Sequence, residues 1–264
     1  MLLAIDVGNT NVVLAVKDGA GTLKMWRMET DVSASSDQYC RRIQDCLGDS
    51  AAQIDDAVVA SVVPDATPLI CGALKIMCGH DPLTVGAAGV DLGIRVNIDQ
   101  PEQAGADRLA DAVGAQVHYD LPAIILDFGT ATTLDLVAAD GSYEGGIIAP
   151  GVALSIETLA QAAAQLPRLE LRDFSEDLPV LGKNTVSAME SGVFWGYVSM
   201  IEGLLMRLRQ EHGDVPAIAT GGLASLFAQH LTGLAAVDPY LTVKGLFEIY
   251  ARNRGEGRAN QNGC

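Results

Sequence analysis

The chain has few basic residues and no arrangement of side chains typical of a transition-metal centre. Only 17 of its 264 residues are Lys or Arg, whereas 33 are Asp or Glu, and the formal net charge is −16 at pH 7. Nucleic acids and anionic membrane surfaces bind basic faces, so we expect neither as a partner. The four histidines are scattered without a ligand spacing, which argues against a transition-metal site.

Cysteine is also scarce. The five cysteines include no Cys-x-x-Cys pair, and their number is odd. An apolar strand pattern begins at Leu2, where a secretory leader would stand, so we expect reduced thiols in a cytoplasmic protein. One uncharged stretch, 215–237, is long enough to span a bilayer. It contains Pro216 and the pair Gly221-Gly222, which favour a strand, a glycine turn and a helix in a soluble protein.

Neither of the two common nucleotide-binding loops is present. The sequence contains no Gly-x-Gly-x-x-Gly and no Gly-x-x-x-x-Gly-Lys-Ser/Thr. Gly182-Lys183-Asn184-Thr185 resembles the end of the second loop, but it lacks the upstream glycine and the hydroxyl directly after Lys183. A nucleotide would therefore need to bind to other features of the chain.

One pattern of residues occurs twice. In each copy a short apolar run ends in an aspartate, a glycine follows two residues later, and a second apolar, β-branched run comes next. This pattern predicts strand, tight turn, strand. The first copy is Asp6-Val7-Gly8-Asn9-Thr10-Asn11, after residues 2–5, and the second is Asp127-Phe128-Gly129-Thr130-Ala131-Thr132, after residues 123–126.

Each copy has the residue types that suit a polyphosphate and its metal ion. Glycine lets the backbone come close to a ligand, and an aspartate binds a cation directly or through water. A single copy could equally be an ordinary hairpin turn, in which Gly and Asn supply positive φ angles. Because the pattern is repeated in the same strand context, we favour an α/β protein of two related halves, with a nucleotide in the cleft between them.

The remaining pattern of the chain predicts alternating strands and helices, enough for one large or two ordinary domains. We expect an N-terminal half over 1–119, a C-terminal half over 120–250, and a flexible polar tail over 251–264. The longest predicted helix runs from Asn184 or Thr185 to His212, and its apolar stripe indicates packing against the core, with a subunit interface as the open alternative. Further helices are predicted from Ser35 to Leu47 and over 68–77, 101–116 and 152–164, and further strands over 23–28, 56–63 and 83–85.

Two other motifs have chemistry that suits a phosphate or its acceptor. Gly105-Ala106-Asp107-Arg108 places a carboxylate beside a guanidinium where a loop enters a helix. Such a pair is often only a surface ion pair or a cap, but phosphoryl transfer to an alcohol needs a proton-accepting carboxylate and nearby cations. Thr220-Gly221-Gly222 lies between a predicted strand and helix, where free amides attract anionic or polar groups.

Taken in order, these motifs resemble those of type III pantothenate kinase over roughly the first 250 residues. The motifs are Asp6 to Asn11, Gly105 to Arg108, Asp127 to Thr132, Gly145-Gly146 with Pro150-Gly151, and Thr220-Gly221-Gly222. The resemblance implies the fold of acetate and sugar kinases, Hsp70 and actin, which is two duplicated actin/ribonuclease-H-like α/β halves with the active site between them. It also implies ATP-dependent phosphorylation of pantothenate to 4'-phosphopantothenate, the first step of coenzyme A biosynthesis.

The resemblance further implies a role for individual residues. Asp107 would be the general base on pantothenate, and Asp127 would bind a monovalent cation, K⁺ or NH₄⁺. Thr185 would reach pantothenate in the partner subunit's site, which implies a homodimer. ATP would be bound by Asp6, Val7, Gly8, Asn9, Thr10, Asn11, Val12, Val13 and Thr130, with Mg²⁺ near Asp6, and pantothenate would also contact Gly105, Ala106 and Arg108.

The sequence departs from the family pattern at one position. The family commonly has Asn-Pro shortly before Gly-Ala-Asp-Arg, whereas this chain has Gln100-Pro101. Two alternatives stay open: a kinase or phosphatase of the same superfamily that acts on another alcohol or on phosphate polymers, and a non-catalytic accessory factor for transcription. The presence of Asp6, Asp107 and Asp127 favours the pantothenate kinase.

Overall fold

In this computed structural model, the described residues are 1–19, 21–162, 167, 169 and 178–255. Contacts within the chain divide them into two compact units. Unit 1 contains residues 1–121, 137–145 and 240–255, and unit 2 contains the described residues of 122–136 and 146–239. The first segment of unit 1 ends at residue 121, and two later segments of the chain, 137–145 and 240–255, also belong to this unit.

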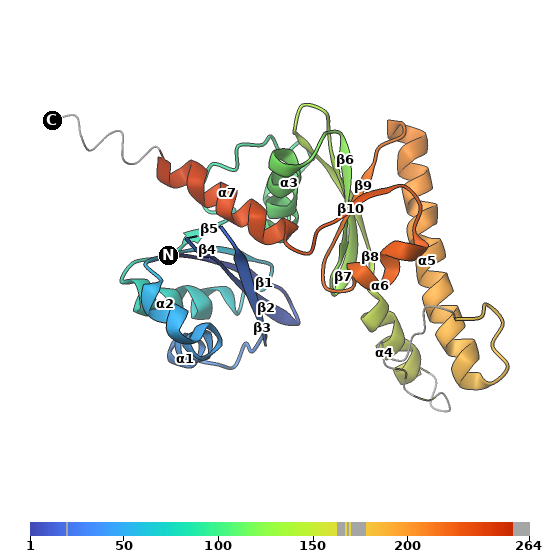
Figure 1. The fold of residues 1–264 in the computed structure, drawn as a ribbon, viewed down its shortest axis with the longest axis horizontal. Coiled ribbons are helices and arrows are strands. Elements are labelled where there is room, and N and C mark those ends of the chain that lie inside the picture. The colour runs from blue at the N-terminus through green and yellow to red at the C-terminus, as the bar shows by residue number, and fades with distance from the viewer. Residues whose placement is uncertain (20, 163–166, 168, 170–177, 256–264) are drawn as a thin grey trace. The chain divides into compact units, whose positions relative to one another are not determined.

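Unit 1 is built on a five-stranded mixed sheet with strand order β3-β2-β1-β4-β5. Strand β2 is antiparallel to both β1 and β3, whereas β4 is parallel to β1 and β5 is parallel to β4. The strands are β1 (Leu2–Val7), β2 (Asn11–Lys17), β3 (Leu23–Glu29), β4 (Asp56–Ser61) and β5 (Leu83–Thr84) (Figure 1).

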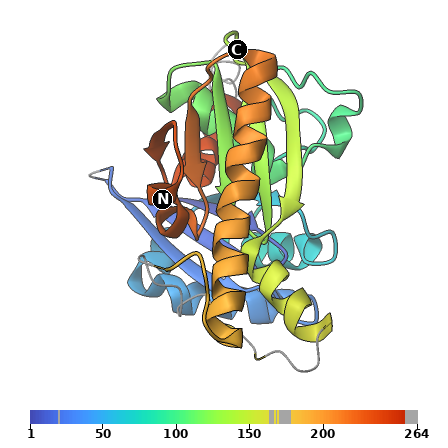
Figure 2. The same ribbon diagram turned by 90° about the vertical axis from the view of Figure 1, so that its right-hand side faces the viewer.

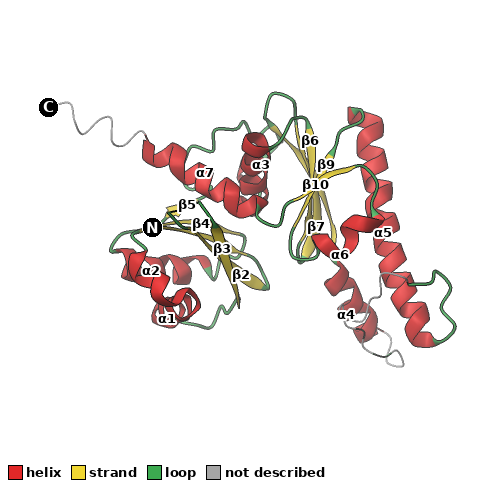
Figure 3. Cartoon of the chain, viewed as in Figure 1, coloured by secondary structure: helices red, strands yellow, loops and turns green. Residues whose placement is uncertain are grey.

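Helices cover both faces of this sheet (Figure 3). Alternate residues of β1 divide between the faces, as period-two alternation requires: Leu3 and Ile5 pack with α1 and α2, and Ala4 packs with α3 and α7. On the second face the central strands present mostly alanine and valine, which lets those helices approach closely. The helices are α1 (Ser36–Leu47), α2 (Thr67–Cys78), α3 (Ala106–His118) and α7 (Leu241–Gly255), with 3₁₀ turns η1 (Gly48–Gln53) and η2 (Pro101–Gln103).

Unit 2 contains the second sheet, whose strand order is β10-β9-β6-β7-β8. Read from the other edge, this order is that of the first sheet, with β6–β7 in the place of β1–β2. The duplication predicted from the repeated hairpin is therefore confirmed by the strand order. The strands are β6 (Ala123–Phe128), β7 (Ala131–Val137), β8 (Tyr143–Pro150), β9 (Ala217–Thr220) and β10 (Leu234–Val237).

Helices α4 (Val152–Ala162), α5 (Thr185–His212) and α6 (Ala224–Phe227) pack against one face of the second sheet, and a 3₁₀ turn, η4 (Ala228–His230), follows α6. The long helix α5 runs lengthwise along the sheet (Figure 2). Aromatic rings form the centre of this core: Phe128 stacks on Phe227 with ring centroids 5.8 Å apart, and Tyr197 contacts Phe227 edge-on at 4.7 Å. Asn184 begins α5 through a capping box with Ser187.

Helices α3 and α7 cross so closely that their backbones touch. A Cβ atom on Gly114 would lie 2.6 Å from the carbonyl oxygen of Leu241, and one on Gly245 would overlap the carbonyl oxygen of Ala110. Since real Cβ atoms are not found at such distances, only glycine fits at either position. The crossing fixes α7 beside α3 in unit 1, although α7 follows the last strand of unit 2 in the sequence.

Two details of the chain differ from the sequence-based expectation. Helix α3 begins at Ala106 rather than near Pro101, because the backbone at Gly105 is extended (φ −59°, ψ 138°). Residues 251–255 belong to α7 rather than to a flexible tail: Arg252 pairs with Glu248, and Asn253 bonds to the backbone of Asp91. The rest of the expected tail, 256–264, and residues 163–164 of the expected fourth helix lie outside the described residues.

The uncharged stretch 215–237 contains the expected strand, glycine turn and helix, as β9, the turn at Gly221 and α6, and it continues into η4 and β10. Across the described part of the chain, no helix combines the length and the apolar character needed to cross a membrane.

We predict that Gly245→Ala destabilises the protein by about 1–3 kcal/mol, because the added methyl group must push α7 away from α3. Gly203→Ala is the matched control. Gly203 lies inside α5, and no described atom other than its own helix backbone lies within 4 Å of a Cβ placed there. This control is expected to be neutral or stabilising by up to about 1 kcal/mol. Urea unfolding measures both, and equal stability of the two variants would contradict the role of the crossing.

Candidate active site

The first hairpin places Asp6 at the end of β1 and a short polar turn after it. Asp6 pairs with Val13 in β2 and with Ala60 in β4, so its backbone lies in the centre of the sheet. Asn9 and Thr10 are exposed at the tip of the turn. Their amide and hydroxyl groups can therefore donate hydrogen bonds to an anionic ligand.

The turn is held by a hydrogen bond within it and by two hydrogen bonds from Thr30. The amide of Gly8 donates to the carbonyl oxygen of Asn11 at 3.0 Å, and the hydroxyl of Thr30 donates to the carbonyl oxygen of Gly8 at 2.6 Å. The amide of Thr30 also donates to Thr10 at 3.0 Å. Thr30, which follows β3, was not singled out from the sequence, because only the folded sheet brings it beside the turn.

The valines of this segment contribute differently from the polar residues. Val7 and Val12 are buried against α1 and α2, and Val13 packs on the opposite face of the sheet. Since these side chains belong to the core, a ligand at the turn could meet only their backbone.

The Gly105–Arg108 motif forms the first turn of α3. The Asp107 side chain folds back, so that its Oδ1 accepts a hydrogen bond from the amide of Arg108 at 2.8 Å. A Cβ on Gly105 would lie 2.6 Å from that oxygen, so the absence of a side chain leaves room for the carboxylate in this orientation. Ala106 is buried in the core beneath α3, whereas Asp107 and Arg108 are half-buried.

Val62 links this motif to the first hairpin. Its amide donates to the carbonyl oxygen of Val7 at 3.1 Å, and its Cγ1 lies 3.5 Å from the position of a Cβ on Gly105. The two motifs therefore meet within unit 1, at the carboxyl ends of β1 and β4. This edge of an open α/β sheet is where ligands usually bind.

The second hairpin gathers three of the sequence motifs within unit 2. Asp127 pairs with Thr220 in the parallel neighbour β9, and the next residue, Gly221, has φ +89°. A Cβ on Gly221 would overlap the Asp127 carboxylate and lie 2.7 Å from the amide nitrogen of Phe128. Gly221 is therefore required both by its positive φ angle and by the short distance to Asp127 and Phe128.

Gly151 makes a similar approach to the turn of this hairpin. A Cβ there would overlap the carbonyl oxygen of Thr130 and lie 2.9 Å from that of Gly129. The carboxylate of Asp127 and these backbone carbonyls are hard oxygen donors, the type that hard cations prefer. Thr130 itself is exposed at the turn.

A buried hydrogen bond ties the start of β7 to α5. The hydroxyls of Thr132 and Tyr197 lie 2.5 Å apart. Burial raises the pKa of Tyr197 to about 12, and the negative charge of Asp127 adds to the shift, whereas the hydrogen bond from Thr132 opposes it. Tyr197 therefore stays neutral at physiological pH, and its hydrogen bond to Thr132 holds the second hairpin against α5.

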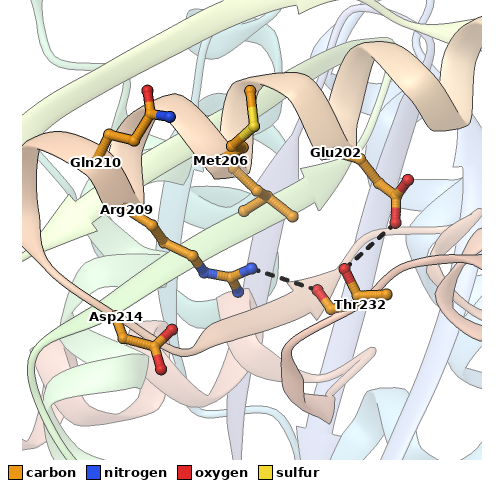
Figure 4. Close-up of a pocket in the computed structure, with 7 residues that line it drawn as sticks. Glu202, Met206, Arg209, Gln210, Asp214 and Thr232 are labelled. Atoms are coloured by element: carbon orange, nitrogen blue, oxygen red, sulfur yellow. Dashed lines mark hydrogen bonds between the residues drawn. The ribbon is translucent and has the colours of Figure 1, made fainter.

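Thr185 is the first residue of α5 and is exposed. It borders a cavity of about 790 Å³ between α4 and α5, whose other lining residues are mainly apolar, among them Leu159, Met189, Val193 and Met200. A second cavity, of about 520 Å³, lies near the carboxyl end of α5 (Figure 4). There Arg209 bonds to the carbonyl oxygens of Val215 and Gly233, and none of the residues singled out from the sequence lines it.

The chain is similar to known proteins over most of its length. A family model described as type III pantothenate kinase matches residues 2–207. The chain is 47% identical to a type III pantothenate kinase of Paramagnetospirillum magneticum over 96% of this chain and 98% of that protein, and 45% identical to one of Caulobacter vibrioides with the same coverage.

Solved structures of similar fold include much more distant proteins. A conserved Baf family transcriptional activator from Campylobacter jejuni aligns with a TM-score of 0.64 at 19% identity, over 96% of this chain and 99% of that chain. An activator of 2-hydroxyisocaproyl-CoA dehydratase from Clostridium difficile, solved with bound ADPNP, aligns with a TM-score of 0.57 at 10% identity, over 98% and 97%. At these identities the likeness concerns the fold alone.

Proposed function

Because this chain belongs to the type III pantothenate kinase family, we propose that it transfers the γ-phosphoryl group of ATP to pantothenate, forming 4'-phosphopantothenate and ADP in the first step of coenzyme A biosynthesis. The observation that carries the proposal is the meeting of Gly105–Arg108 with the Asp6–Asn11 turn around Val62. An acidic proton acceptor thereby lies beside a turn suited to phosphates.

ATP is bound in this proposal by residues 6–13 and by Thr130. The exposed Asn9 and Thr10 offer donors, and the bonds from Thr30 keep the turn in one shape before the nucleotide arrives. A turn that is already ordered loses less conformational entropy on binding. Gly8 and Gly129 leave the backbone of each hairpin open to close approach.

The donor sets fit the two cations that the resemblance implies. Mg²⁺ in kinases is held by one or two carboxylates together with substrate phosphates, so Asp6 alone suffices on the protein side. Asp127 and the carbonyl oxygens of the second hairpin would hold K⁺ or NH₄⁺. Both cations would offset the negative charge of the phosphate oxygens.

Asp107 acts as the general base. The bond from the Arg108 amide to Oδ1 fixes the orientation of the carboxylate. As the pantothenate hydroxyl oxygen attacks the γ-phosphorus, its proton passes to Asp107, and the bond to the bridging oxygen of ADP breaks. Arg108 and the backbone of Gly105 and Ala106 hold the acceptor.

Two further features belong to the proposal. Thr185 of one subunit completes the pantothenate site of the other, which is supported by its exposure at the start of α5 and by the apolar cavity beside it. The protein works in the cytoplasm, which is supported by the four described cysteines, all of them free thiols. The alternatives, a kinase or phosphatase with another acceptor and a non-catalytic accessory factor for transcription, are not favoured, since relatives of 41–47% identity are named type III pantothenate kinase.

We predict that Asp107→Asn folds like the wild type and loses about 10²- to 10⁴-fold in turnover, the usual effect of removing a general base. A coupled assay of ATP consumption with pantothenate, Mg²⁺ and K⁺ measures the loss. Asp37→Asn is the matched control, because Asp37 also lies in the first turn of a helix, α1, and it should keep wild-type rates. Turnover of Asp107→Asn within twofold of the wild type would sink the assignment.

We predict that activity depends on K⁺ or NH₄⁺ and falls when Na⁺ replaces them. In Asp127→Asn the K⁺ concentration for half-maximal activity should rise by roughly tenfold or more, since unit charges 4 Å apart near a protein surface attract by about 4 kcal/mol. Asp214→Asn makes the same charge change at an exposed residue of unit 2 and should leave the K⁺ titration unchanged. Identical K⁺ titrations of Asp127→Asn and the wild type would refute the cation site.

We predict that two inactive variants restore activity when their subunits are mixed. In a heterodimer of Asp107→Asn and Thr185→Arg, one site keeps its own Asp107 and receives the partner's intact Thr185. Random pairing by co-expression should therefore recover roughly a quarter of wild-type activity. If Thr185 serves its own subunit instead, no heterodimer has an intact site, and the mixture stays as inactive as its components.

A further inference from the structure

The guanidinium group of Arg108 lies over an aromatic ring. Its Cζ is 5.7 Å from the centroid of the Tyr143 ring, within the range of a cation–π interaction. Both residues belong to unit 1. Tyr143 is fully buried, so it presents its ring to Arg108 from inside the protein.

The backbone of Tyr143 is held on both sides. Its amide donates to the carbonyl oxygen of Arg95 at 2.8 Å, and its carbonyl oxygen accepts from the amide of Asn97 at 2.8 Å. Asn97 Nδ2 also donates to the carboxylate of Glu144 at 3.0 Å. These bonds join β8 to the segment that leads into the Gly105–Arg108 motif.

Gly145 permits this arrangement. It has φ +94°, a conformation that other residues rarely adopt, and a Cβ there would lie 3.2 Å from Cγ2 of Ile98. Gly145 thus has a role in this chain that its sequence did not reveal. It lies two residues after Tyr143, and the absence of a side chain there lets Ile98 pack close to β8.

We propose that Tyr143 is a positioning residue, which holds the Arg108 guanidinium in the orientation that binds pantothenate. The inference rests on the proposed function, in which Arg108 contacts that substrate. A free arginine side chain loses much rotational freedom when it binds a ligand, and a ring face that already orients it removes part of this cost. The effect of Tyr143 should therefore appear in pantothenate binding and only through Arg108.

The experiment compares steady-state constants for the wild type, Tyr143→Leu, Arg108→Gln and the double variant. Tyr143→Leu should raise the KM for pantothenate by about 3- to 30-fold, the range expected for a lost cation–π interaction, with the KM for ATP and kcat within about twofold of the wild type. In the Arg108→Gln background, Tyr143→Leu should add less than about twofold. Tyr143→Phe keeps the ring and should restore the wild-type KM.

Tyr39→Leu is the matched control. Tyr39 is also a fully buried tyrosine of unit 1 with an arginine over its ring, Arg42 at 5.9 Å, but it lies in α1. This variant should lower stability and leave both KM values unchanged. The inference would be overturned if Tyr143→Leu raised the KM for pantothenate equally in the wild-type and Arg108→Gln backgrounds, or if it raised the KM values for pantothenate and ATP equally. Either result would show that Tyr143 has a merely structural role.

Two outcomes separate the inference from the proposed function. If the wild type folds but shows no pantothenate-dependent turnover, the proposed function and the inference are both overturned. If the wild type is active but the effects of Tyr143→Leu and Arg108→Gln on the KM for pantothenate are additive, only the inference is overturned. If Tyr143→Leu does not fold, phenylalanines with increasing ring fluorination at position 143 replace it. Fluorination weakens the negative face of the ring with little change in shape, so the KM for pantothenate should rise along the series, and a constant KM would refute the proposal.

Discussion

The crossing of α3 and α7 is the constraint on which the first unit depends. Gly114 and Gly245 let the two backbones touch, and a side chain at either position would meet a carbonyl oxygen. The same two helices form one face of the first sheet's core through Ala106, Ala110 and Leu246. Because α3 is fixed against both the sheet and α7, its first turn is held at the carboxyl ends of β1 and β4. Asp107 and Arg108 owe their place to this packing.

At three places in the candidate site, a carboxylate or carbonyl oxygen lies close to a glycine. Asp107 lies over Gly105, Asp127 lies against Gly221, and the turn after Asp127 lies against Gly151. In each case glycine serves to leave space for an oxygen atom, and not to make the backbone flexible. Rigid supports surround these positions, such as the Thr30 bonds to the first turn and the Tyr197 bond to Thr132. Within each unit, these oxygen atoms are therefore held in position by the surrounding backbone and side chains.

The sequence was sufficient for features that depend on local chemistry. The repeated hairpins, the start of α5 at Asn184 or Thr185 and the glycine turn at Gly221 follow from residue types and short spacings. Features that depend on distant packing were missed. Helix α7 was not predicted from the sequence, and neither was its return to α3 in the first unit. Likewise, nothing near Tyr143 in the sequence points to Arg108, because only the bridge between β8 and residues 95–97 brings them together.

The account makes one chemical claim above all, that the phosphoryl group of ATP is transferred to pantothenate. Phosphorus NMR of the reaction mixture tests it most directly, with Mg²⁺, K⁺ and the unmodified protein, and with sugars and inorganic polyphosphate offered in parallel. We expect one new phosphomonoester signal, formed in equal amount with ADP and only when pantothenate is present. Phosphate transfer to another acceptor, or no phosphorylated pantothenate from folded protein, would contradict the account.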